Sequence, residues 1–199
     1  MQQFYSRRFV LTGGATLAAL AAVPGAAFAV SSGQAKSHVE NLVADINRVI
    51  DSGKSESGMI QDFSAIFARY SDRSYIAAYA LGADGRSATT AQKKAFSAAF
   101  SDYVARKYGK RFRNFIGGKL EVNGVKKVKN AFQVSTTAYM RGEAPFEVTF
   151  FVGEKSGLFY NMYIEGVNML LTERTEIGAM LDRRRGDLDA MIADLKRAG

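Results

Sequence analysis

The stretch AFQVSTTAYMRGEAPFEVTFFVGEKSGLFYNMYIE, residues 131–165, decides the fold because apolar side chains recur in it at every second position. Alternation of period two is typical of strands with one buried face. The segments GEAP and EKSG interrupt the alternation with the glycine and polar residues that favour hairpin turns. We therefore predict three strands, over residues 131–141, 145–154 and 158–165, joined by short turns into an antiparallel meander.

A further strand precedes these three. The segment 119–128 follows Gly117-Gly118 and is joined to the next strand by a Lys129-Asn130 turn. The result is a four-stranded, curved, antiparallel meander with one apolar face. The predicted apolar faces of the last three strands comprise Phe132, Val134, Ala138 and Met140, then Phe146, Val148, Phe150 and Val152, and finally Leu158, Tyr160, Met162 and Ile164.

Upstream and downstream of the meander, apolar residues recur at steps of three and four, which is typical of amphipathic helices. Thr89 and Gln92 form a T-x-x-Q capping box, so one helix starts there, and we expect it to continue past Gly109 with a kink. The predicted helical ranges are 39–50, 59–70, 72–81, 89–116, 167–181 and 187–195. Helices, then strands, then helices predict a single α+β domain over residues 30–199.

The first 29 residues have the order of an export signal. Arg7-Arg8 precede a weakly apolar run, and small residues end at Ala29. The pattern SRRFVL indicates twin-arginine export, and an ordinary secretory signal with two arginines is the alternative. We predict a signal peptide over residues 1–29, cleaved after Ala29, and a flexible new N-terminus over residues 30–37. No later stretch is apolar over the ~20 residues that a membrane helix needs, so we expect a soluble product.

The chain offers few groups for catalysis. It lacks cysteine, and His38 is its only histidine. Metal sites, thiolate catalysis and Ser-His-Asp triads need these residues among suitable partners, so we expect no metal, no cofactor and no such catalytic residue. His38, beside the predicted flexible segment, should be solvated. A carboxylate in an apolar cavity can still act as a general base, and the acids nearest apolar surfaces are Asp62, Asp102 and Glu165.

The chain carries an excess of positive charge. Its net charge is +8, and removal of Arg7 and Arg8 with the signal leaves +6. In a cytosolic protein such an excess points to nucleic acid. After export we expect no nucleic acid, but anionic lipid headgroups or an acidic protein surface. The run Arg183-Arg184-Arg185 ends a predicted helix, where its charge favours the helix dipole or contacts such a partner.

Aromatic residues are abundant. Residues 30–199 contain eleven Phe and eight Tyr but no Trp. They fall on predicted helix stripes and on one face of the predicted sheet. Such a surplus forms an ordinary core, or it lines a largely apolar pocket where a curved sheet does not close completely on its helices.

Two blocks carry distinctive patterns. Residues 87–112, SATTAQKKAFSAAFSDYVARKYGKRF, contain S-A-T-x-x-Q, then F-x-x-A-F-x-x-Y and a Y-G pair. Residues 160–181, YNMYIEGVNMLLTERTEIGAML, are close to the pattern Y-D-x-x-x-E-G-V-S followed by a helix. These blocks resemble the periplasmic MlaC-type phospholipid-binding proteins, also called toluene-tolerance auxiliary components. Here Asn161, Asn168 and Ile177 replace the usual Asp, Ser and aromatic residue.

The resemblance covers most of residues 36–198 and implies a periplasmic carrier without enzymatic activity. Such a carrier holds a phospholipid by its acyl chains and moves it between an inner-membrane ABC-type transporter complex and an outer-membrane lipoprotein complex. Burial of each methylene is worth about 0.8 kcal/mol, so a diacyl lipid with ~30 of them needs a carrier to cross water. The alternative is a small α+β enzyme or a polycyclic-lipid binder that uses a buried carboxylate.

This hypothesis assigns roles to three sets of residues. The tails should lie between an aromatic helix stripe and the apolar sheet face. The predicted lipid-binding residues are Phe96, Phe100, Tyr103, Val134, Phe146, Val148, Phe150, Tyr160 and Met162. Glu165 and Gly166 should form the strand-to-helix junction, where Glu165 accepts backbone N–H bonds or lies at the pocket mouth. The predicted docking face comprises Lys93, Lys94, Arg183, Arg184 and Arg185.

Overall fold

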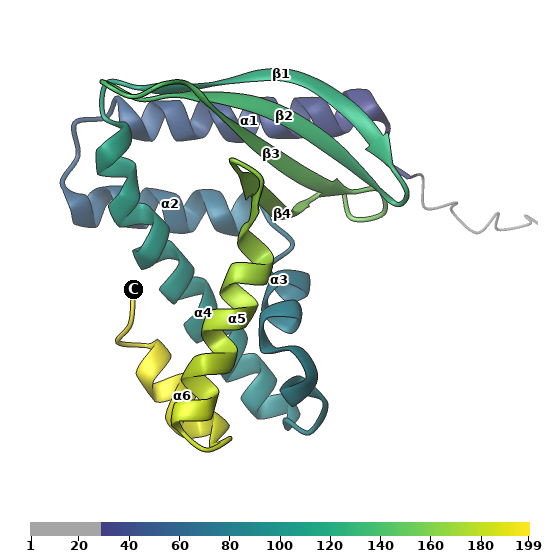
Figure 1. Ribbon diagram of the computed structural model, residues 1–199, viewed down its shortest axis with the longest axis vertical. Coiled ribbons are helices and arrows are strands. Elements are labelled where there is room, and N and C mark those ends of the chain that lie inside the picture. The colour runs from purple at the N-terminus through teal and green to yellow at the C-terminus, as the bar shows by residue number, and fades with distance from the viewer. Residues whose placement is uncertain (1–28) are drawn as a thin grey trace, which may run out of the picture.

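The computed structural model describes residues 29–199, so the predicted signal peptide lies outside the described residues except for Ala29. Figure 1 shows a curved sheet with helix α1 along it, and a second group of helices that the long helix α4 reaches from below the sheet. In the part of the chain from 29 to 199, no helix is both long enough and apolar enough to cross a membrane. The helices are α1 (Ser32–Ile50), α2 (Glu56–Tyr70), α3 (Arg73–Leu81), α4 (Thr90–Arg111), α5 (Met169–Arg183) and α6 (Leu188–Leu195).

The sheet has five strands in chain order, and each neighbouring pair is antiparallel. Its strands are β1 (Lys119–Val128), β2 (Ala131–Tyr139), β3 (Phe146–Gly153), β4 (Phe159–Ile164) and β5 (Val167–Asn168). The predicted α+β class and the four long strands of the meander are confirmed. The sequence did not predict β5, because two residues are too few to show alternation.

The apolar face of the sheet is buried as predicted in β2 and β3 but shifted in β4. The pairing of β3 with β4 is irregular between Phe151 and Val152, so that Phe159 lies opposite Val152. Phe159 is buried there, whereas Tyr160 packs its ring edge against Tyr75 at 5.1 Å between centroids. The assignment of Leu158 to the buried face was wrong, because Tyr160 is an extra residue in β4 and puts Phe159 opposite Val152. Tyr160 itself still borders the cavity, as predicted.

Helix α1 begins earlier than predicted. Ser31 and Gln34 form a capping box at its N-terminus, and the Val30 N–H donates to the Glu154 carbonyl oxygen at 2.9 Å. The prediction of a flexible segment over residues 30–37 was therefore wrong. The missed signal was S-x-x-Q, the same kind of capping box that correctly placed the start of α4.

Helix α1 covers the sheet beside its first strand. The Asn47 side chain accepts from the Leu120 N–H at 2.9 Å and donates to the Leu120 carbonyl oxygen at 3.0 Å. It thereby replaces a strand partner for one residue of the edge strand β1. A register shift between Val122 and Gly124 bends β1 in its middle. Together these features curve the sheet around α1. Helix α2 lies below α1 in Figure 1, and at its C-terminal end the Phe67 ring packs against Phe159 of β4, with 6.3 Å between centroids.

Helix α4 connects the two halves of the molecule. Its second half packs on α2, α3 and α6 pack on α4 as well, and α3 also packs on α5. At its end the chain tightens into a short 3₁₀ helix, η2 (Phe112–Phe115), and turns into β1. The predicted continuation past Gly109 is confirmed, but as this 3₁₀ segment. Gly109 lies against Ile60 of α2, where an added Cβ atom would be 2.9 Å from the Ile60 Cα atom.

The junction between β4 and α5 differs from the prediction. Glu165 and Gly166 have φ of +50° and +80° and form a two-residue hairpin turn between β4 and β5, the conformation of a type I′ turn. The N-cap of α5 is Asn168, whose side-chain oxygen accepts from the Leu171 N–H at 3.1 Å. The interpretation of Glu165 as the residue that accepts N–H bonds at this helix was therefore wrong.

Candidate functional site

A cavity of about 520 Å³ lies between the sheet, α1, α2 and the second half of α4. Its volume is in the range of ~300–1,000 Å³ that is typical of small-molecule sites. The apolar part of its wall includes Leu42 from α1, Phe63 and Phe67 from α2, Val104 from α4, and Val148 and Phe150 from β3. Because four separate elements contribute apolar side chains, the cavity is suited to an apolar ligand.

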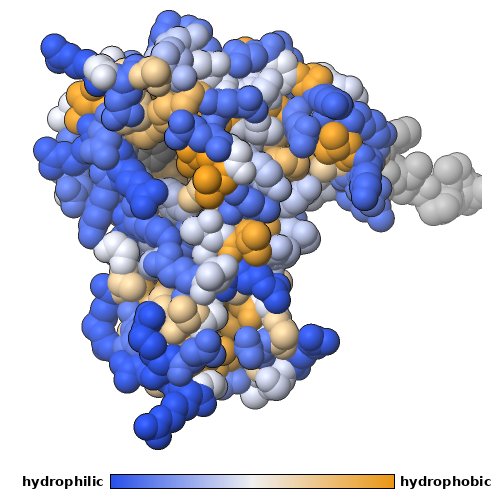
Figure 2. All heavy atoms as spheres, in the orientation of Figure 1, coloured by the Kyte–Doolittle hydropathy of each residue, from blue (hydrophilic) through white to orange (hydrophobic). Residues whose placement is uncertain are grey.

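The cavity opens at one end of the sheet. Five exposed residues of its wall mark the opening, and they come from the end of α4, from η2, from the β2–β3 turn and from the β4–β5 turn. They are Arg111, Asn114, Glu143, Ala144 and Glu165. In Figure 2 this face of the molecule is hollowed towards the upper left, beside hydrophobic residues and among hydrophilic ones. The opening is thus polar, while the interior is apolar.

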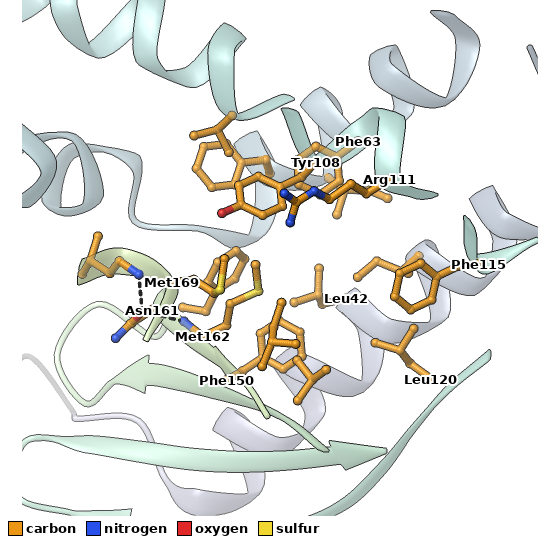
Figure 3. A pocket seen from close by; sticks show the side chains of 18 of the residues that line it. Leu42, Phe63, Tyr108, Arg111, Phe115, Leu120, Phe150, Asn161, Met162 and Met169 are labelled. Atoms are coloured by element: carbon orange, nitrogen blue, oxygen red, sulfur yellow. Dashed lines mark hydrogen bonds between the residues drawn. The ribbon is translucent and has the colours of Figure 1, made fainter. Parts of the chain in front are cut away.

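The close view shows how the two walls face each other. Tyr108 and Arg111 lie side by side on the helical wall, and Phe150 and Met162 lie opposite them on the sheet wall (Figure 3). The Arg111 guanidinium points into the space between the walls (Figure 3). At one end Asn161 accepts from the N–H groups of Met162 at 2.8 Å and Leu170 at 3.0 Å. This amide therefore holds β4 and the first turn of α5 together beside the cavity.

Six of the nine predicted lipid-binding residues line the cavity. They are Phe100, Phe146, Val148, Phe150, Tyr160 and Met162. Phe96, Tyr103 and Val134 lie elsewhere, in the closely packed core. The first turns of α4 lie among α3, α5 and α6, away from the sheet (Figure 1), so its cavity-lining stripe begins only at Phe100 and continues through Val104, Tyr108 and Arg111.

Helices α1 and α2 also line the cavity, which the sequence did not predict. The residues that it missed there are Leu42, Ile46, Phe63, Ile66 and Phe67. Their helices were predicted from the apolar period, but the period shows only that one face is buried. The apolar face of α2 is wider than packing on one neighbouring helix requires. This width is the signal in the sequence that α2 also borders a second apolar surface, here the cavity.

A buried polar cluster joins α4 to α5 at the cavity wall. The Glu173 side chain belongs to the wall, is only 6% exposed, and accepts through Oε1 from Lys107 Nζ at 2.7 Å and from the Tyr108 hydroxyl at 2.5 Å. Burial and the Glu173 carboxylate raise the pKa of Tyr108 above its usual range, so the phenol stays protonated and donates. Glu173 Oε2 has no hydrogen-bond partner among the described residues.

Lys107 also contacts the neighbouring Glu176 at 2.5 Å. Burial opposes ionisation of Glu176, yet the hydrogen bond and charge of Lys107 outweigh this effect and lower the pKa of the carboxyl, with a smaller contribution from the more distant charge of Arg111. Burial also raises the pKa of Tyr103, one turn before Lys107, above its usual range. The Lys107 ammonium therefore lies between two carboxylates, those of Glu173 and Glu176, and its charge is balanced inside the protein.

The three acids considered as general bases lie outside such an environment. Asp62 is paired with Lys54 at 2.7 Å at the surface, and Asp102 and Glu165 are exposed. Among residues 29–199, no three His, Cys, Asp or Glu side chains are grouped to hold a metal ion. His38 was expected to be solvated, but it is half-buried, and its Nε2 atom is 2.9 Å from the Tyr70 carbonyl oxygen, linking α1 to the end of α2.

Nearly the whole described chain matches a known protein family. The sequence model of the MlaC protein family matches residues 37–197. The chain belongs to the MlaC family. A solved structure of a phospholipid-binding protein from Ralstonia solanacearum in complex with a phospholipid has the same fold, with a TM-score of 0.66. The two sequences are 19% identical, and the match covers 81% of this chain and 98% of that chain.

In this MlaC-family chain the two distinctive sequence blocks meet at the cavity. The block 87–112 forms α4, and the block 160–181 forms β4, β5 and α5. Lys107 and Tyr108 from the first block bind Glu173 from the second. Residues far apart in the sequence thus share one polar cluster.

The predicted docking residues lie at the other end of α4. The Gln92 side chain donates to Asp189 at 3.0 Å, so the exposed Lys93 and Lys94 lie near the start of α6 and the arginine run before it. Arg184 is engaged by Asp194, with contacts of 2.5 and 2.7 Å. Helical rise places Lys93 roughly 27 Å from Arg111 along α4, so this basic end is remote from the cavity mouth.

Proposed function

We propose that the protein is a periplasmic carrier that binds a phospholipid by its acyl chains and does not catalyse a reaction. The single observation that carries this proposal is the cavity, which is apolar inside, polar at one opening and built into an MlaC-family chain. The phospholipid in the structure of the Ralstonia solanacearum protein supports the same ligand class. Tails inside and a headgroup at the opening match this distribution of polarity.

Exposure of lipid tails to water costs much free energy. Each buried methylene is worth about 0.8 kcal/mol, so a free diacyl lipid leaves a membrane very rarely. A protein that removes the tails from water lowers this cost without any covalent step. Because transfer requires no nucleophile or general base, the carrier hypothesis needs none of the exposed acids to act.

The decisive experiment is extraction of bound lipid. Protein purified from a bacterial periplasm is extracted into organic solvent, and the extract is analysed by mass spectrometry. We expect about one phospholipid per protein, and delipidated protein should take up phospholipid from vesicles. Repeated preparations that contain no lipid and take none from vesicles would contradict the proposal.

A second candidate ligand is a polycyclic lipid. The buried Oε2 atom of Glu173 has no partner among the described residues, and a ligand hydroxyl could donate to it. An enzyme that uses Glu173 as a base fits less well, because Lys107 and the Tyr108 hydroxyl already donate to its Oε1 atom, at 2.7 and 2.5 Å. The same extraction distinguishes the two ligands, since a polycyclic lipid and a phospholipid differ in mass and phosphorus content.

The proposal extends to shuttling between an inner-membrane ABC-type transporter complex and an outer-membrane lipoprotein complex. The exposed residues Lys93, Lys94, Arg183 and Arg185 support transient, charge-steered docking. Reversal of Arg183 and Arg185 to Glu leaves the Arg184–Asp194 pair in place, so stability and bound lipid should not change. Transfer between reconstituted donor and acceptor complexes should slow at low salt, and an unchanged rate at low and moderate salt would contradict docking through this surface.

A further inference from the structure

The charged residues of the cavity wall differ in whether they form an ion pair with another residue of the protein. Within the described chain, the wall contains four charged residues: Arg111, Glu143, Glu165 and Glu173. Glu173 is neutralised inside the protein by Lys107. Arg111 is the only cation of this wall, and no described carboxylate lies within ion-pair distance of it. The wall therefore offers one cationic group for a ligand.

Arg111 is held in place without being neutralised. Its guanidinium lies over the Tyr108 ring, 5.6 Å from the ring centroid. Tyr108 is itself fixed by its hydrogen bond to Glu173 and packs against Phe63, with 6.4 Å between ring centroids. Stacking on an aromatic ring orients the planar guanidinium and leaves its N–H groups available for an acceptor.

The position of Arg111 matches a specific part of a lipid. It is the last residue of α4, at the exposed opening, and its guanidinium points inward towards the cavity (Figure 3). The exposed amide of Asn114 lies in the same part of the wall and supplies a second donor type. When the tails fill the apolar interior, the first charged group beyond the tails and their ester linkages is the phosphate. A guanidinium binds a phosphate through two parallel N–H···O bonds.

We propose that Arg111 binds the lipid phosphate and makes the protein select phosphate-bearing lipids over neutral lipids with the same tails. This inference rests on the proposed function and adds the group that sets ligand class. Asn114 contributes a further donor at the same opening. The apolar cavity accommodates the tails of either lipid class, so selection depends on the opening and not on the interior.

The test compares two lipids that differ only in the headgroup. Purified, delipidated protein is incubated with vesicles that contain equal amounts of phosphatidylethanolamine and diacylglycerol with the same acyl chains. The lipid that remains on the re-isolated protein is quantified by mass spectrometry. We expect the wild type to prefer the phospholipid by on the order of tenfold or more, the ratio that one charge-assisted contact supports. Arg111→Gln should bring this ratio close to one while total bound lipid persists, and Arg111→Lys should fall between them.

The matched control is Arg113→Gln. Arg113 is two residues away and equally basic, but it pairs with Glu56 at 3.6 Å and is not part of the cavity wall. Its loss should leave the ratio unchanged. A third arm adds oleate to the vesicles, because a fatty-acid carboxylate is the competing anion.

The possible results distinguish a failure of the Arg111 proposal from a failure of the carrier function. Equal uptake of the two lipids by the wild type, an unchanged ratio in Arg111→Gln, or uptake of oleate equal to that of phospholipid would overturn the role of Arg111 while leaving the carrier function standing. An equal loss of both lipids in Arg111→Gln would also overturn it, since Arg111 would then support the cavity in general. Uptake of neither lipid by the wild type would overturn the carrier function itself.

Discussion

Gly118 is the residue at which the helical part of the chain passes into the sheet. A Cβ atom added there would be 2.2 Å from the Tyr139 carbonyl oxygen, which belongs to the neighbouring strand and cannot rotate away. The backbone must therefore shift for any larger residue to fit. Close approach at this residue lets β1 begin directly after η2.

Replacement of Gly118 by Ala should destabilise the protein by about 3 kcal/mol, the upper part of the range for overpacking. In a domain of this size that corresponds to a fall in Tm of roughly 6–12 °C. The control is Gly178→Ala in α5, where the added Cβ atom meets nothing within 4 Å. The control should stabilise by about 0.5–1 kcal/mol because Ala favours helix. Equal Tm values for the two variants would contradict the backbone clash.

Asp45 gives the fold a dependence on acidic pH. The Tyr70 hydroxyl donates to Asp45 at 2.7 Å and lowers the pKa of the carboxyl against the effect of burial, with help from Arg48 and Arg69. A carboxyl whose pKa is lowered on folding stabilises the native state above its unfolded pKa of about 3.9. That stabilisation is lost as the pH falls from there through the folded pKa.

Tyr70→Phe should therefore cost about 1 kcal/mol at pH 7, and the difference from the wild type should shrink below about pH 4. Urea unfolding at pH 7 and at pH 3 measures this. Tyr79→Phe is the control, since the described residues provide no hydrogen bond to its hydroxyl. A difference between wild type and Tyr70→Phe that is the same at both pH values would mean that the variant acts through packing alone.

At the scale of elements, Asn168 connects the sheet to α5. Its side-chain oxygen caps the helix and accepts from Asn161 at 3.0 Å, and its amide group donates to the Tyr163 hydroxyl at 3.1 Å. Glu165, three residues earlier, occupies the tight turn, and its only hydrogen bond to residues 29–199 is from its backbone N–H to the Glu147 carbonyl oxygen at 3.0 Å. Asn168 therefore caps the helix, whereas Glu165 forms the turn.

Asn168→Ala should lower the free energy of unfolding by about 1–2 kcal/mol, because it removes the cap of α5 and leaves Asn161 without one partner. Asn168→Ser keeps a capping oxygen and should cost less. Glu165→Gln should have no effect on stability beyond about 0.5 kcal/mol. Thermal unfolding of the three variants measures this order, and a larger loss in Glu165→Gln than in Asn168→Ala would restore Glu165 as the capping residue.

At the scale of the whole molecule, two buried positions on the same face of the sheet differ in what surrounds them. Val134 and Val148 lie on the same apolar face, in neighbouring strands, and both are buried. Val148 borders the cavity, whereas Val134 is enclosed by core atoms. The same substitution should therefore have different effects at the two positions.

Val148→Trp should fill part of the cavity, cost about 1–3 kcal/mol and sharply reduce lipid retention while the protein remains folded. Val134→Trp has no free volume to occupy, so it should destabilise more strongly. Circular dichroism reports folding, and extraction with mass spectrometry reports the lipid. Normal lipid retention by folded Val148→Trp would place the lipid elsewhere, and unfolding of this variant would show that Val148 is close-packed.

The sequence by itself determined the α+β class, the helices and the four long strands, because these depend on local apolar period and on turn and capping residues. It also determined the family, and Asp187 and Thr89 at the starts of their helices were predicted correctly from the same local chemistry. Two wrong predictions, a flexible segment over residues 30–37 and Glu165 as a cap, also concerned local chemistry. In each case the true capping residue, Ser31 or Asn168, lay within the same short segment.

Only the tertiary structure decided where the cavity lies. Whether Phe96 or Tyr108 faces the cavity depends on which part of α4 comes close to the sheet, and the apolar period shows that a residue is buried without showing what lies opposite it. The slip in β4 that buries Phe159 depends on pairing with β3. The cavity and the position of Arg111 at its opening are properties of volume and distance between segments far apart in the chain, and no local pattern encodes them.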